Sequence, residues 1–401
     1  MDGKPRPMGD KMHTVEHLRT AARRRLPRLV FDFVDGGAGP ESALAGNLAA
    51  FARTRLLPRA LVDCDHRSPA TELFGRRYAA PFGVAPIGLA NVVWPGTDEA
   101  LARTAAAADI PYILSTAGTT AIERIAEVAP KHAWFQLYAG RDQRIVDDLL
   151  ARAERAGMEA LLVTVDVQAP GKRVRDLVNE FTLPFRLSPR GALDVACHPA
   201  WAGAVLRRGK PRFANLEAYG SPGASAESLA ALMASQSTAR LDWRMVDDIR
   251  KRWPRRLLLK GVLDPEDARR AVDIGADGIV VSNHGGRQLD AAPAPLEVLP
   301  AVREAVGGRI AVLIDGGIRT GEDIAKALAA GADFVLMGRP WLYGVGALGP
   351  EKGAAATLRI LQDEFDRALA HLGCPTVKDL SRQRLWPGDR DRQAGNRPPA
   401  P

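Results

Sequence analysis

Short apolar segments recur along the chain, and most of them are followed by hydrophobic residues at helical spacing. Eight segments have the length and composition of buried strands: 81–86, 111–114, 133–138, 160–165, 256–261, 278–281, 310–315 and 334–337. Helical patterns occupy 143–156 and 266–274, and Thr320 opens another helix through Leu328 with a capping motif. Eight strands alternating with helices predict an α/β fold, a closed (β/α)8 TIM barrel. An open doubly wound sheet is the alternative, although candidate polar residues follow strands three to eight rather than one switch point.

Two regions lie outside the repeat. Residues 14–60 predict N-terminal helices, two short ones around Leu26-Pro27 that end at the glycine-rich 36–39, and then an extended connection. A long insertion after strand four, about 169–236, is rich in proline, glycine and arginine, and loops of this size are usually functional or disordered. We therefore predict one domain over 1–385 and a disordered tail at 386–401.

Charge and cysteine content narrow the function classes. The 401 residues carry a net charge of +8 and a pI near 9.6, which favours anionic ligands or an acidic membrane surface. Basic clusters are not interleaved with aromatic residues, so we expect no nucleic-acid binding. The three cysteines have no metal-binding spacing, which predicts no metal site and a reducing compartment. Because the sequence has no apolar signal region or membrane-spanning stretch, we expect a cytoplasmic protein, or one peripheral on the inner face of the cell membrane.

The segment 278–290 carries the strongest chemical signal. An apolar strand ends abruptly in His284, two glycines and Arg287. An imidazole that titrates near neutral pH can act as a base, and a guanidinium matches a carboxylate with two hydrogen bonds. A surface loop with a capping histidine and a solvated arginine is the alternative, but the combination at a strand end favours a catalytic site.

Two glycine-flanked arginines follow the last two strands. They occur in Asp315-Gly316-Gly317-Ile318-Arg319 and in Gly338-Arg339-Pro340. In a barrel these strand ends form a phosphate pocket from backbone N–H groups and fixed positive charge, whereas the alternative is two tight turns. Strand five ends in Lys260, which in a barrel mouth would neutralise developing negative charge rather than extend to solvent.

Strands three and four end in further polar residues. Strand three offers the amide of Gln136 and the phenol of Tyr138, either of which could also be a buried polar group with a local partner. Strand four gives Thr164 and Asp166, followed by Arg173. A carboxylate at this place can orient a neutral histidine and stabilise its imidazolium, although Asp166 and Arg173 could also form a simple ion pair.

Together these motifs resemble the FMN-dependent L-2-hydroxy acid oxidase and dehydrogenase family. The resemblance covers residues from about 14 to 385 in the family's order. It rests on six segments: Phe135-Gln136-Leu137-Tyr138, Thr164-Val165-Asp166, Lys260-Gly261-Val262, 282–290, Asp315-Gly316-Gly317 and Gly338-Arg339-Pro340.

The resemblance implies a role for each matching residue. His284 would act as the base, Asp166 would stabilise its imidazolium, Tyr138 would hydrogen-bond near the substrate hydroxyl, and Arg173 with Arg287 would bind the substrate carboxylate. Lys260 would lie beside the N1 and O2 edge of FMN and stabilise its anionic reduced form. The other implied cofactor-binding residues are Pro86, Ile87, Gly88, Ser115, Gln136, Thr164 and Ser282 around the isoalloxazine, and Asp315, Gly316, Gly317, Arg319, Gly338 and Arg339 around the ribityl phosphate. The resemblance also implies a homotetramer.

Three positions refine the implied substrate and electron acceptor. Phe33 stands where the family usually has a tyrosine that helps to bind the carboxylate, which favours larger apolar substrates. Ile87 stands where a threonine is more usual, which removes a polar contact near the flavin. Gly88 stands where oxidases of the family commonly have alanine, which favours a quinone or another carrier over oxygen.

The insertion supports the same acceptor. Between 185 and 216, basic residues surround the apolar stretch 200–206, a pattern that predicts contact with an anionic membrane, although a solvated or disordered loop would show it too.

We therefore expect FMN-dependent oxidation of an L-2-hydroxy acid with an aromatic or bulky side chain to the 2-keto acid. The C2 hydrogen leaves either as a proton, giving a carbanion, or as hydride while His284 takes the hydroxyl proton, and the sequence leaves both routes open. The alternatives are an oxidase that makes hydrogen peroxide, a non-redox barrel that binds FMN or another phosphate, and a non-catalytic basic protein.

Overall fold

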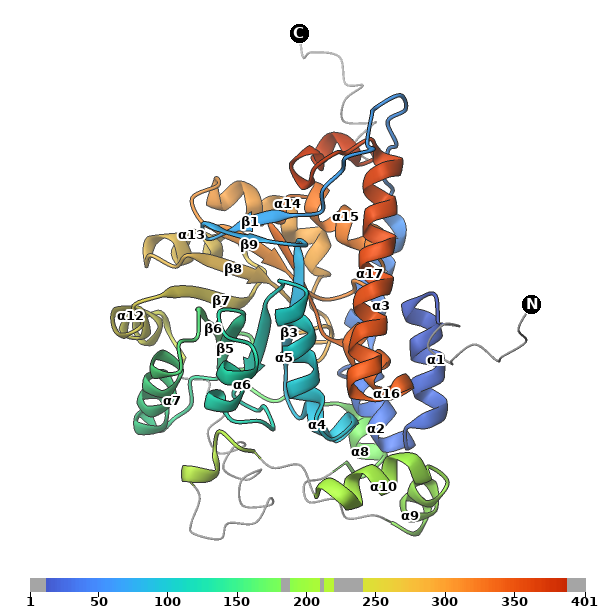
Figure 1. Cartoon of the computed structure of the whole chain (residues 1–401). Helices are drawn as coiled ribbons and strands as arrows, with labels where there is room; N and C mark the ends of the chain where they lie inside the picture. Colours follow the sequence, from blue (N-terminus) through green and yellow to red (C-terminus); the bar gives the residue numbers. More distant parts are fainter. Residues whose placement is uncertain (1–11, 182–187, 210–212, 220–240, 388–401) are drawn as a thin grey trace, which may run out of the picture.

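The computed structural model describes residues 12–181, 188–209, 213–219 and 241–387. Eight parallel strands close into a barrel in the order β10-β3-β4-β5-β6-β7-β8-β9, which confirms the predicted (β/α)8 fold (Figure 1). The strands are β3 (Phe82–Ile87), β4 (Tyr112–Ser115), β5 (Ala133–Leu137), β6 (Ala160–Thr164), β7 (Arg256–Val262), β8 (Gly278–Val281), β9 (Ala311–Ile314) and β10 (Phe334–Met337).

The pairing of neighbouring strands places polar residues at the same level along the barrel axis. Ser115 on β4 pairs with Gln136 on β5, and Thr164 on β6 pairs with Lys260 on β7. These residues therefore meet at the C-terminal end, where barrel enzymes place their chemistry.

Helices surround the barrel and pack apolar side chains toward it. They are α4 (Ala90–Val93), α5 (Thr97–Ala107), α6 (Ile122–Val128), α7 (Gln143–Arg155), α12 (Trp243–Arg252), α13 (Pro265–Asp273), α14 (Pro295–Val306), α15 (Gly321–Ala329), α16 (Arg339–Leu348) and α17 (Pro350–Leu372). The predicted cap of α15 is present, because the Thr320 hydroxyl accepts from the N–H of Asp323 and the Asp323 carboxylate accepts from the N–H of Thr320. The short turns η3 (Val377–Asp379) and η4 (Arg382–Arg384) follow α17.

A hairpin of β1 (Thr71–Leu73) and β2 (Arg76–Tyr78) closes the N-terminal end of the barrel. Its Leu73 and Tyr78 join the interior cluster that contains Trp134 and Phe334. This end is packed with apolar side chains, so the open end of the barrel is the C-terminal one.

Three helices precede the barrel: α1 (Val15–Arg25), α2 (Arg28–Asp35) and α3 (Ser42–Arg53). The first two confirm the prediction, but the extended connection expected after residue 39 is wrong, because 42–53 form α3. This helix buries Ala43, Asn47, Ala50 and Phe51. Alanine has the highest helix propensity, and its small side chains leave only a faint apolar stripe in the sequence, which concealed the helix.

In its described part, the insertion forms α8 (Val174–Val178), α9 (Pro189–Ala196), α10 (Pro199–Arg208) and the short turn η2 (Glu217–Tyr219). In Figure 1, α8, α9 and α10 lie together near α2. Trp201 on α10 is buried and donates from Nε1 to the carbonyl oxygens of Val92 and Val93 on α4, at 3.2 and 3.0 Å. Among the described helices, none is long and apolar enough to cross a membrane.

The first residue of the predicted tail contacts the segment that follows α3. The Trp386 backbone N–H donates to the Arg55 carbonyl at 2.8 Å, and residues 388–401 lie outside the described part of the chain.

Candidate active site

A cavity of about 520 Å³ opens at the C-terminal ends of the strands. Most of the residues predicted from sequence line it: Phe33, Pro86, Ile87, Gly88, Tyr138, Thr164, Arg173, Lys260, His284, Arg287, Asp315, Gly316, Gly317, Arg319, Gly338 and Arg339. Ser115, Gln136 and Ser282 are buried next to lining residues, and Asp166 contacts His284. The fold thus brings the whole predicted set together.

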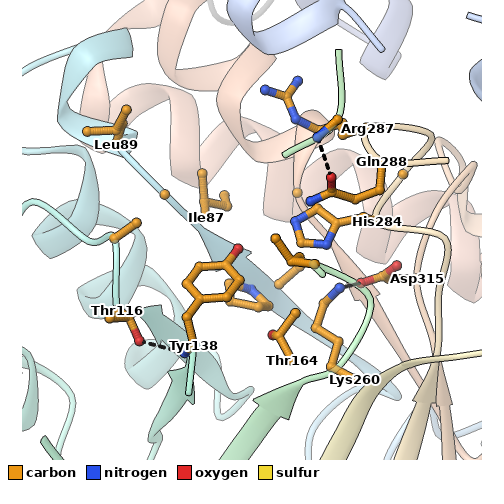
Figure 2. Close-up of a pocket in the computed structure, with 18 of the residues that line it drawn as sticks. Ile87, Leu89, Thr116, Tyr138, Thr164, Lys260, His284, Arg287, Gln288 and Asp315 are labelled. Atoms are coloured by element: carbon orange, nitrogen blue, oxygen red, sulfur yellow. Dashed lines mark hydrogen bonds and ion pairs between the residues drawn. The ribbon is translucent and has the colours of Figure 1, made fainter. Parts of the chain in front are cut away.

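A chain of buried hydrogen bonds lies beside the cavity. The Ser115 hydroxyl donates to Gln136 Oε1 at 2.7 Å, and Gln136 Nε2 donates to Thr164 Oγ1 at 2.9 Å. Thr116, for which the sequence predicted no role of its own, accepts the Tyr138 backbone N–H at 3.1 Å and so fixes the backbone of that residue (Figure 2).

The amine of Lys260 is fixed by two partners. Its Nζ donates to Ser282 Oγ at 3.0 Å and lies 3.1 Å from Asp315 Oδ2. Burial alone would lower the pKa of Lys260, but the carboxylates of Asp315 and Asp166 outweigh burial and raise it. The site therefore holds a permanent buried positive charge.

His284 lies against Asp166. Its Nδ1 is 3.1 Å from Asp166 Oδ1 and 3.3 Å from Oδ2, so an Nδ1–H donor leaves Nε2 as the nitrogen that can accept a proton. Burial opposes ionisation of Asp166, but the charge and hydrogen bond of His284 outweigh it and lower the pKa of that carboxyl.

Figure 2 shows His284, Tyr138 and Lys260 around one common space. Burial raises the pKa of Tyr138, which keeps its phenol protonated.

Arg287 and Arg173 form the cationic side of the cavity. Arg287 Nη1 donates to the carbonyls of Phe33 and Gly36 at 2.8 and 3.0 Å, and Arg173 Nε lies 3.4 Å from Asp176 Oδ2. Burial lowers the pKa of Arg287, and the neighbouring Arg173 and Arg339 act in the same direction. A guanidinium keeps its proton at neutral pH, so an entering carboxylate would relieve this repulsion.

The turns after β9 and β10 suit a phosphate. Gly316 and Gly317 both have φ of 92°, a conformation that favours glycine, and a side chain added at Gly338 would meet only Ile87, at 3.9 Å. Arg319 donates from Nη1 to the Ile318 carbonyl and lines the cavity. Asp315 Oδ1 is buried with no hydrogen-bond partner among the described residues, and Asp315 Oδ2 pairs with Lys260. Because a carboxylate repels a phosphate and needs a donor, Asp315 suits an N–H of the flavin ring better than the phosphate role that the family resemblance implies. These groups fit FMN. The unpartnered oxygen of Asp315 suits a ring N–H, and Lys260 suits the electron-rich edge of the ring. The glycines and the guanidinium of Arg319 suit the phosphate.

Arg339 is arranged differently from Arg319. Its Nε, Nη1 and Nη2 donate to the carbonyls of Val34, Gly285 and Gly36 at 3.0, 2.8 and 2.8 Å. The Arg339 guanidinium therefore joins the end of α2 to the loop of His284, which the motif Gly-Arg-Pro does not reveal.

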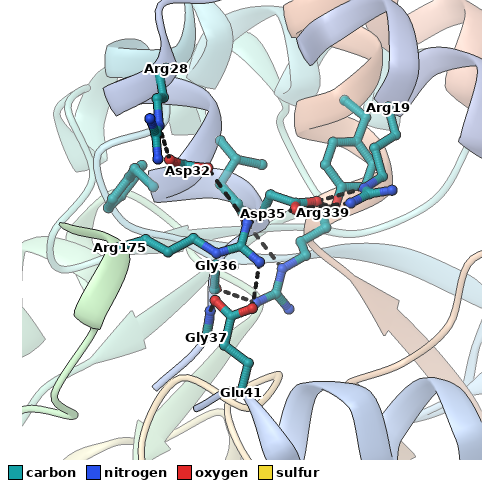
Figure 3. A network of polar contacts seen from close by, with 12 residues as sticks. Arg19, Arg28, Asp32, Asp35, Gly36, Gly37, Glu41, Arg175 and Arg339 are labelled. Carbon is teal, nitrogen blue, oxygen red and sulfur yellow. Dashed lines mark hydrogen bonds and ion pairs between the residues drawn. The ribbon is translucent and has the colours of Figure 1, made fainter. Parts of the chain in front are cut away.

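A charged network behind the cavity ties α2 to α1, α8 and α16 (Figure 3). Asp35 accepts from Arg19 at 2.6 and 3.0 Å, from Tyr343 at 2.7 Å and from Arg175 at 3.1 Å. Burial opposes ionisation of Asp35, but these hydrogen bonds, Arg19 first, lower its pKa to about 2. Arg175 also pairs with Glu41. The network fixes the helices next to Phe33, Arg173 and Arg339.

The insertion contributes apolar walls that the sequence analysis did not assign. Phe181 stacks on Phe33 with ring centroids 4.6 Å apart and planes 2° from parallel. Phe213 and Leu216 line the cavity, and so does Leu149 of α7. Asn215 anchors the Phe213 segment, because its Oδ1 accepts from the Ile122 N–H and its Nδ2 donates to the Thr120 carbonyl. The only signal in the sequence was that apolar residues interrupt a basic insertion.

Comparisons with known proteins agree with this site. Residues 22–387 match the family model described as FMN-dependent dehydrogenase. The chain is 42% identical over 374 residues to (S)-mandelate dehydrogenase of Pseudomonas putida, covering 93% of this chain and 94% of that protein. It is 40% identical over 374 residues to L-lactate dehydrogenase of Caulobacter sp. (strain K31), covering 93% and 98%. A crystal structure of the monotopic membrane protein (S)-mandelate dehydrogenase superposes with a TM-score of 0.90 at 42% identity, covering 94% of this chain and 99% of that one.

Proposed function

We propose a substrate and an electron acceptor for this chain, which belongs to the FMN-dependent dehydrogenase family and is an FMN-dependent 2-hydroxy acid dehydrogenase. The substrate is an L-2-hydroxy acid with an aromatic or similarly bulky side chain, as in mandelate, and the product is the 2-keto acid. The electrons pass to a quinone or another carrier. The observation that carries the choice of substrate is the stacked pair of Phe33 and Phe181 beside the two arginines.

The apolar wall supports a large side chain. Phe33 offers no hydroxyl to a carboxylate, and its ring is occupied on one face by Phe181. Phe213, Leu216 and Leu149 extend the apolar lining beyond this pair. A small substrate such as lactate would leave this surface without a partner, whereas an aryl group would cover it. The motifs Gly88-Leu89 and Trp94-Pro95, with residues 114–117, 175–177, 197–201 and 208–211, also resemble (S)-mandelate dehydrogenase most among members of the family.

Different residues of the chain bind the substrate and move the proton. Arg173 and Arg287 bind the substrate carboxylate and fix C2 before the base. His284 takes a proton at Nε2, from C2 in one route and from the hydroxyl in the other, and Asp166 stabilises the imidazolium through Nδ1. Tyr138 donates a hydrogen bond toward the substrate oxygen.

FMN, when bound, supplies the acceptor for the two electrons. Lys260 places its positive charge, and Asp315 its unpartnered oxygen, at the cofactor's polar edge. Gly316, Gly317 and Arg319 after β9 and Gly338 after β10 would hold the phosphate, and Arg339 would contribute from the position after Gly338.

The insertion supports an acceptor in a membrane. Leu193 and Leu206 are exposed by 68% and 84%, and the exposed Arg190 and Arg207 lie close to them in the sequence. Leu177 on α8 is exposed by 64%. Apolar side chains among basic residues suit the surface of an anionic bilayer. The sequence predicts membrane contact for the whole apolar stretch 200–206 within 185–216. Trp201 of that stretch is buried against α4 instead of facing outward, so it is left out of the proposed contact. Residues 185–187 and 210–212 lie outside the described chain.

We further propose the homotetramer that the family resemblance implies.

One experiment tests substrate and acceptor together. The purified yellow protein is mixed anaerobically with (S)-mandelate, (R)-mandelate, L-lactate and glycolate, and the FMN absorption is followed. We expect (S)-mandelate to bleach the flavin with the largest ratio of rate to half-saturating concentration. The bleached protein should be reoxidised faster by a soluble quinone than by air. Faster bleaching by lactate would contradict the proposed aromatic substrate. Rapid reoxidation by air would indicate an oxidase. If no hydroxy acid bleaches the flavin, the alternative of a non-redox barrel is favoured.

A further inference from the structure

The loop that carries His284 has an unusual backbone. His284, Gly285 and Gly286 are consecutive residues with φ of 58°, 66° and 75°. A left-handed conformation costs a non-glycine residue about 1 kcal/mol or more, so surrounding contacts must hold His284 in place. Within the loop, the Ser282 hydroxyl accepts the His284 N–H at 2.9 Å.

A buried pair of amides holds this loop from outside. Asn47 Nδ2 donates to Asn283 Oδ1 at 2.9 Å, and Asn283 Nδ2 donates to Asn47 Oδ1 at 2.7 Å. Asn283 uses its other N–H on the Pro293 carbonyl, and its Oδ1 also accepts the Gly286 N–H. The two residues are only 1% and 4% exposed. Every donor and acceptor of the Asn283 amide is therefore committed, which fixes the residue directly before the base.

Helix α3 is locked to the same loop at more than one place. A side chain added at Gly286 would lie 2.6 Å from the Leu44 nitrogen, so the loop and the helix touch backbone to backbone. Ala43 donates its N–H to Asp290 Oδ1 at 3.0 Å, and Ala38 donates to the Gly286 carbonyl at 2.8 Å. The amide pair also lies under the phosphate turn, because a side chain added at Gly316 would meet Asn283 Oδ1 at 3.3 Å and Asn47 Nδ2 at 3.4 Å.

We propose that Asn47 is a positioning residue for His284: through its paired hydrogen bonds with Asn283, it holds the left-handed loop that aims the imidazole at the substrate and at Asp166. The proposal rests on the proposed oxidation of a 2-hydroxy acid. Asn47 lies on α3 and acts only through Asn283, so it contributes geometry to the base and no proton of its own.

Two substitutions at Asn47 test the proposal. Asn47→Ala removes both hydrogen bonds and should lower the rate of anaerobic FMN bleaching at saturating (S)-mandelate by about tenfold to a hundredfold, the scale of a small misplacement of a catalytic group. Asn47→Asp keeps the shape. Its protonated carboxyl can donate and accept as the amide does, whereas its carboxylate has no donor for Asn283 Oδ1. The bleaching rate of Asn47→Asp relative to the unchanged protein should therefore be highest at acidic pH and fall as pH rises.

The control variant is Ala50→Gly, which weakens α3 by about 1 kcal/mol through helix propensity, also removes a buried methyl group, and leaves the amide pair in place. Its bleaching rate should stay close to that of the unchanged protein. Thermal unfolding and binding of the 2-keto acid product, followed by the FMN spectrum, are measured on every variant. Product binding should change little, because Arg173 and Arg287 bind the carboxylate.

The outcomes separate the possible failures. Equal bleaching rates for Asn47→Ala and Ala50→Gly, or a pH-independent ratio for Asn47→Asp, would overturn the positioning role while the proposed function stands. If the unchanged protein is not bleached by any 2-hydroxy acid, the proposed function fails and this inference fails with it. Should Asn47→Ala not fold, the pH-dependent ratio of Asn47→Asp decides alone.

Discussion

Arg287 and Arg339 donate to the same acceptor, the carbonyl oxygen of Gly36, at 3.0 and 2.8 Å. Gly36 is the C-terminal cap of α2, where carbonyl groups lack helical partners and the helix dipole favours positive charge. One helix end thus anchors the arginine proposed for the substrate carboxylate and the arginine that reaches the loop of His284. A change at this anchor would disturb substrate binding and proton transfer together.

His284→Ala should leave FMN bound and lower its rate of bleaching by about 10²- to 10⁴-fold, the usual contribution of a general base. Retention is expected because the phosphate turn lies on other strands. Anaerobic stopped-flow absorption measures the rate, and the FMN content of the purified variant is the control. A variant bleached at the unchanged rate would remove His284 from the proton transfer.

Arg319→Ala should weaken FMN retention by about 1.5–3 kcal/mol, the scale of a hydrogen bond to a charged group. Arg339→Ala should weaken it on the same scale and should also slow bleaching, because Arg339 holds the carbonyls of Gly36 and Gly285. FMN fluorescence on release measures retention, and the two rates are compared after FMN has been restored by saturation. Unchanged retention in both variants would contradict the phosphate assignment.

Phe33→Tyr should improve binding of lactate and glycolate by roughly 0.5–1.5 kcal/mol if the new hydroxyl reaches the carboxylate. The stacked ring of Phe181 should hold the new tyrosine in the same plane. Steady-state kinetics over a series of side chains measures the change, and Phe181→Leu serves as the control for lost stacking. Selectivity that stays flat along the series would place Phe33 outside the substrate site.

Gly88→Ala should raise the rate at which dithionite-reduced protein reacts with oxygen, as the family pattern at this position suggests. The added methyl would lie 3.1 Å from the Cβ of Ala117, so it repacks the space beside the flavin by a few tenths of an ångström. Oxygen mixing measures the rate, and bleaching by substrate is the control. An unchanged rate would show that this glycine does not limit the reaction with oxygen.

Membrane contact is tested at exposed leucines. Leu193→Glu with Leu206→Glu should reduce sedimentation with anionic vesicles and leave bleaching intact, because both side chains are exposed. Trp201 should be left unchanged, since its burial against α4 would confuse loss of the fold with loss of binding. Vesicle binding equal to that of the unchanged protein would show that these leucines of the insertion do not contact the membrane.

Acid stability should depend on Asp35. Its pKa is lowered from 3.8 to about 2 in the folded chain, so its contribution is fully present above 3.8 and is lost as pH falls toward 2. The shift corresponds to about 2 kcal/mol at most. Urea denaturation should show the free energies of unfolding of the unchanged protein and Asp35→Asn converging over this window. A constant difference between them would contradict the assignment.

Local signals in the sequence predicted the barrel well, because each strand is a short apolar segment that ends in its own polar motif. The same signals placed His284, Lys260 and Arg319 at one mouth, since strand ends converge in a closed barrel. The contacts that join distant segments had no such signal. Neither the alanine-rich α3 nor the aromatic partner Phe181 follows from local pattern, and the three carbonyl partners of Arg339 depend on how α2 packs.

The contact between Asn47 and Asn283 spans 236 positions of the chain. Contacts of such sequence separation are slow to form, because the loop between them must first be closed. A growing chain releases α3 early, but β8 and its loop follow only after most of the barrel has been synthesised. We therefore expect the conformation of His284 to be completed late in folding, and the onset of activity in a refolding chain to report closure of the whole barrel rather than formation of any one part.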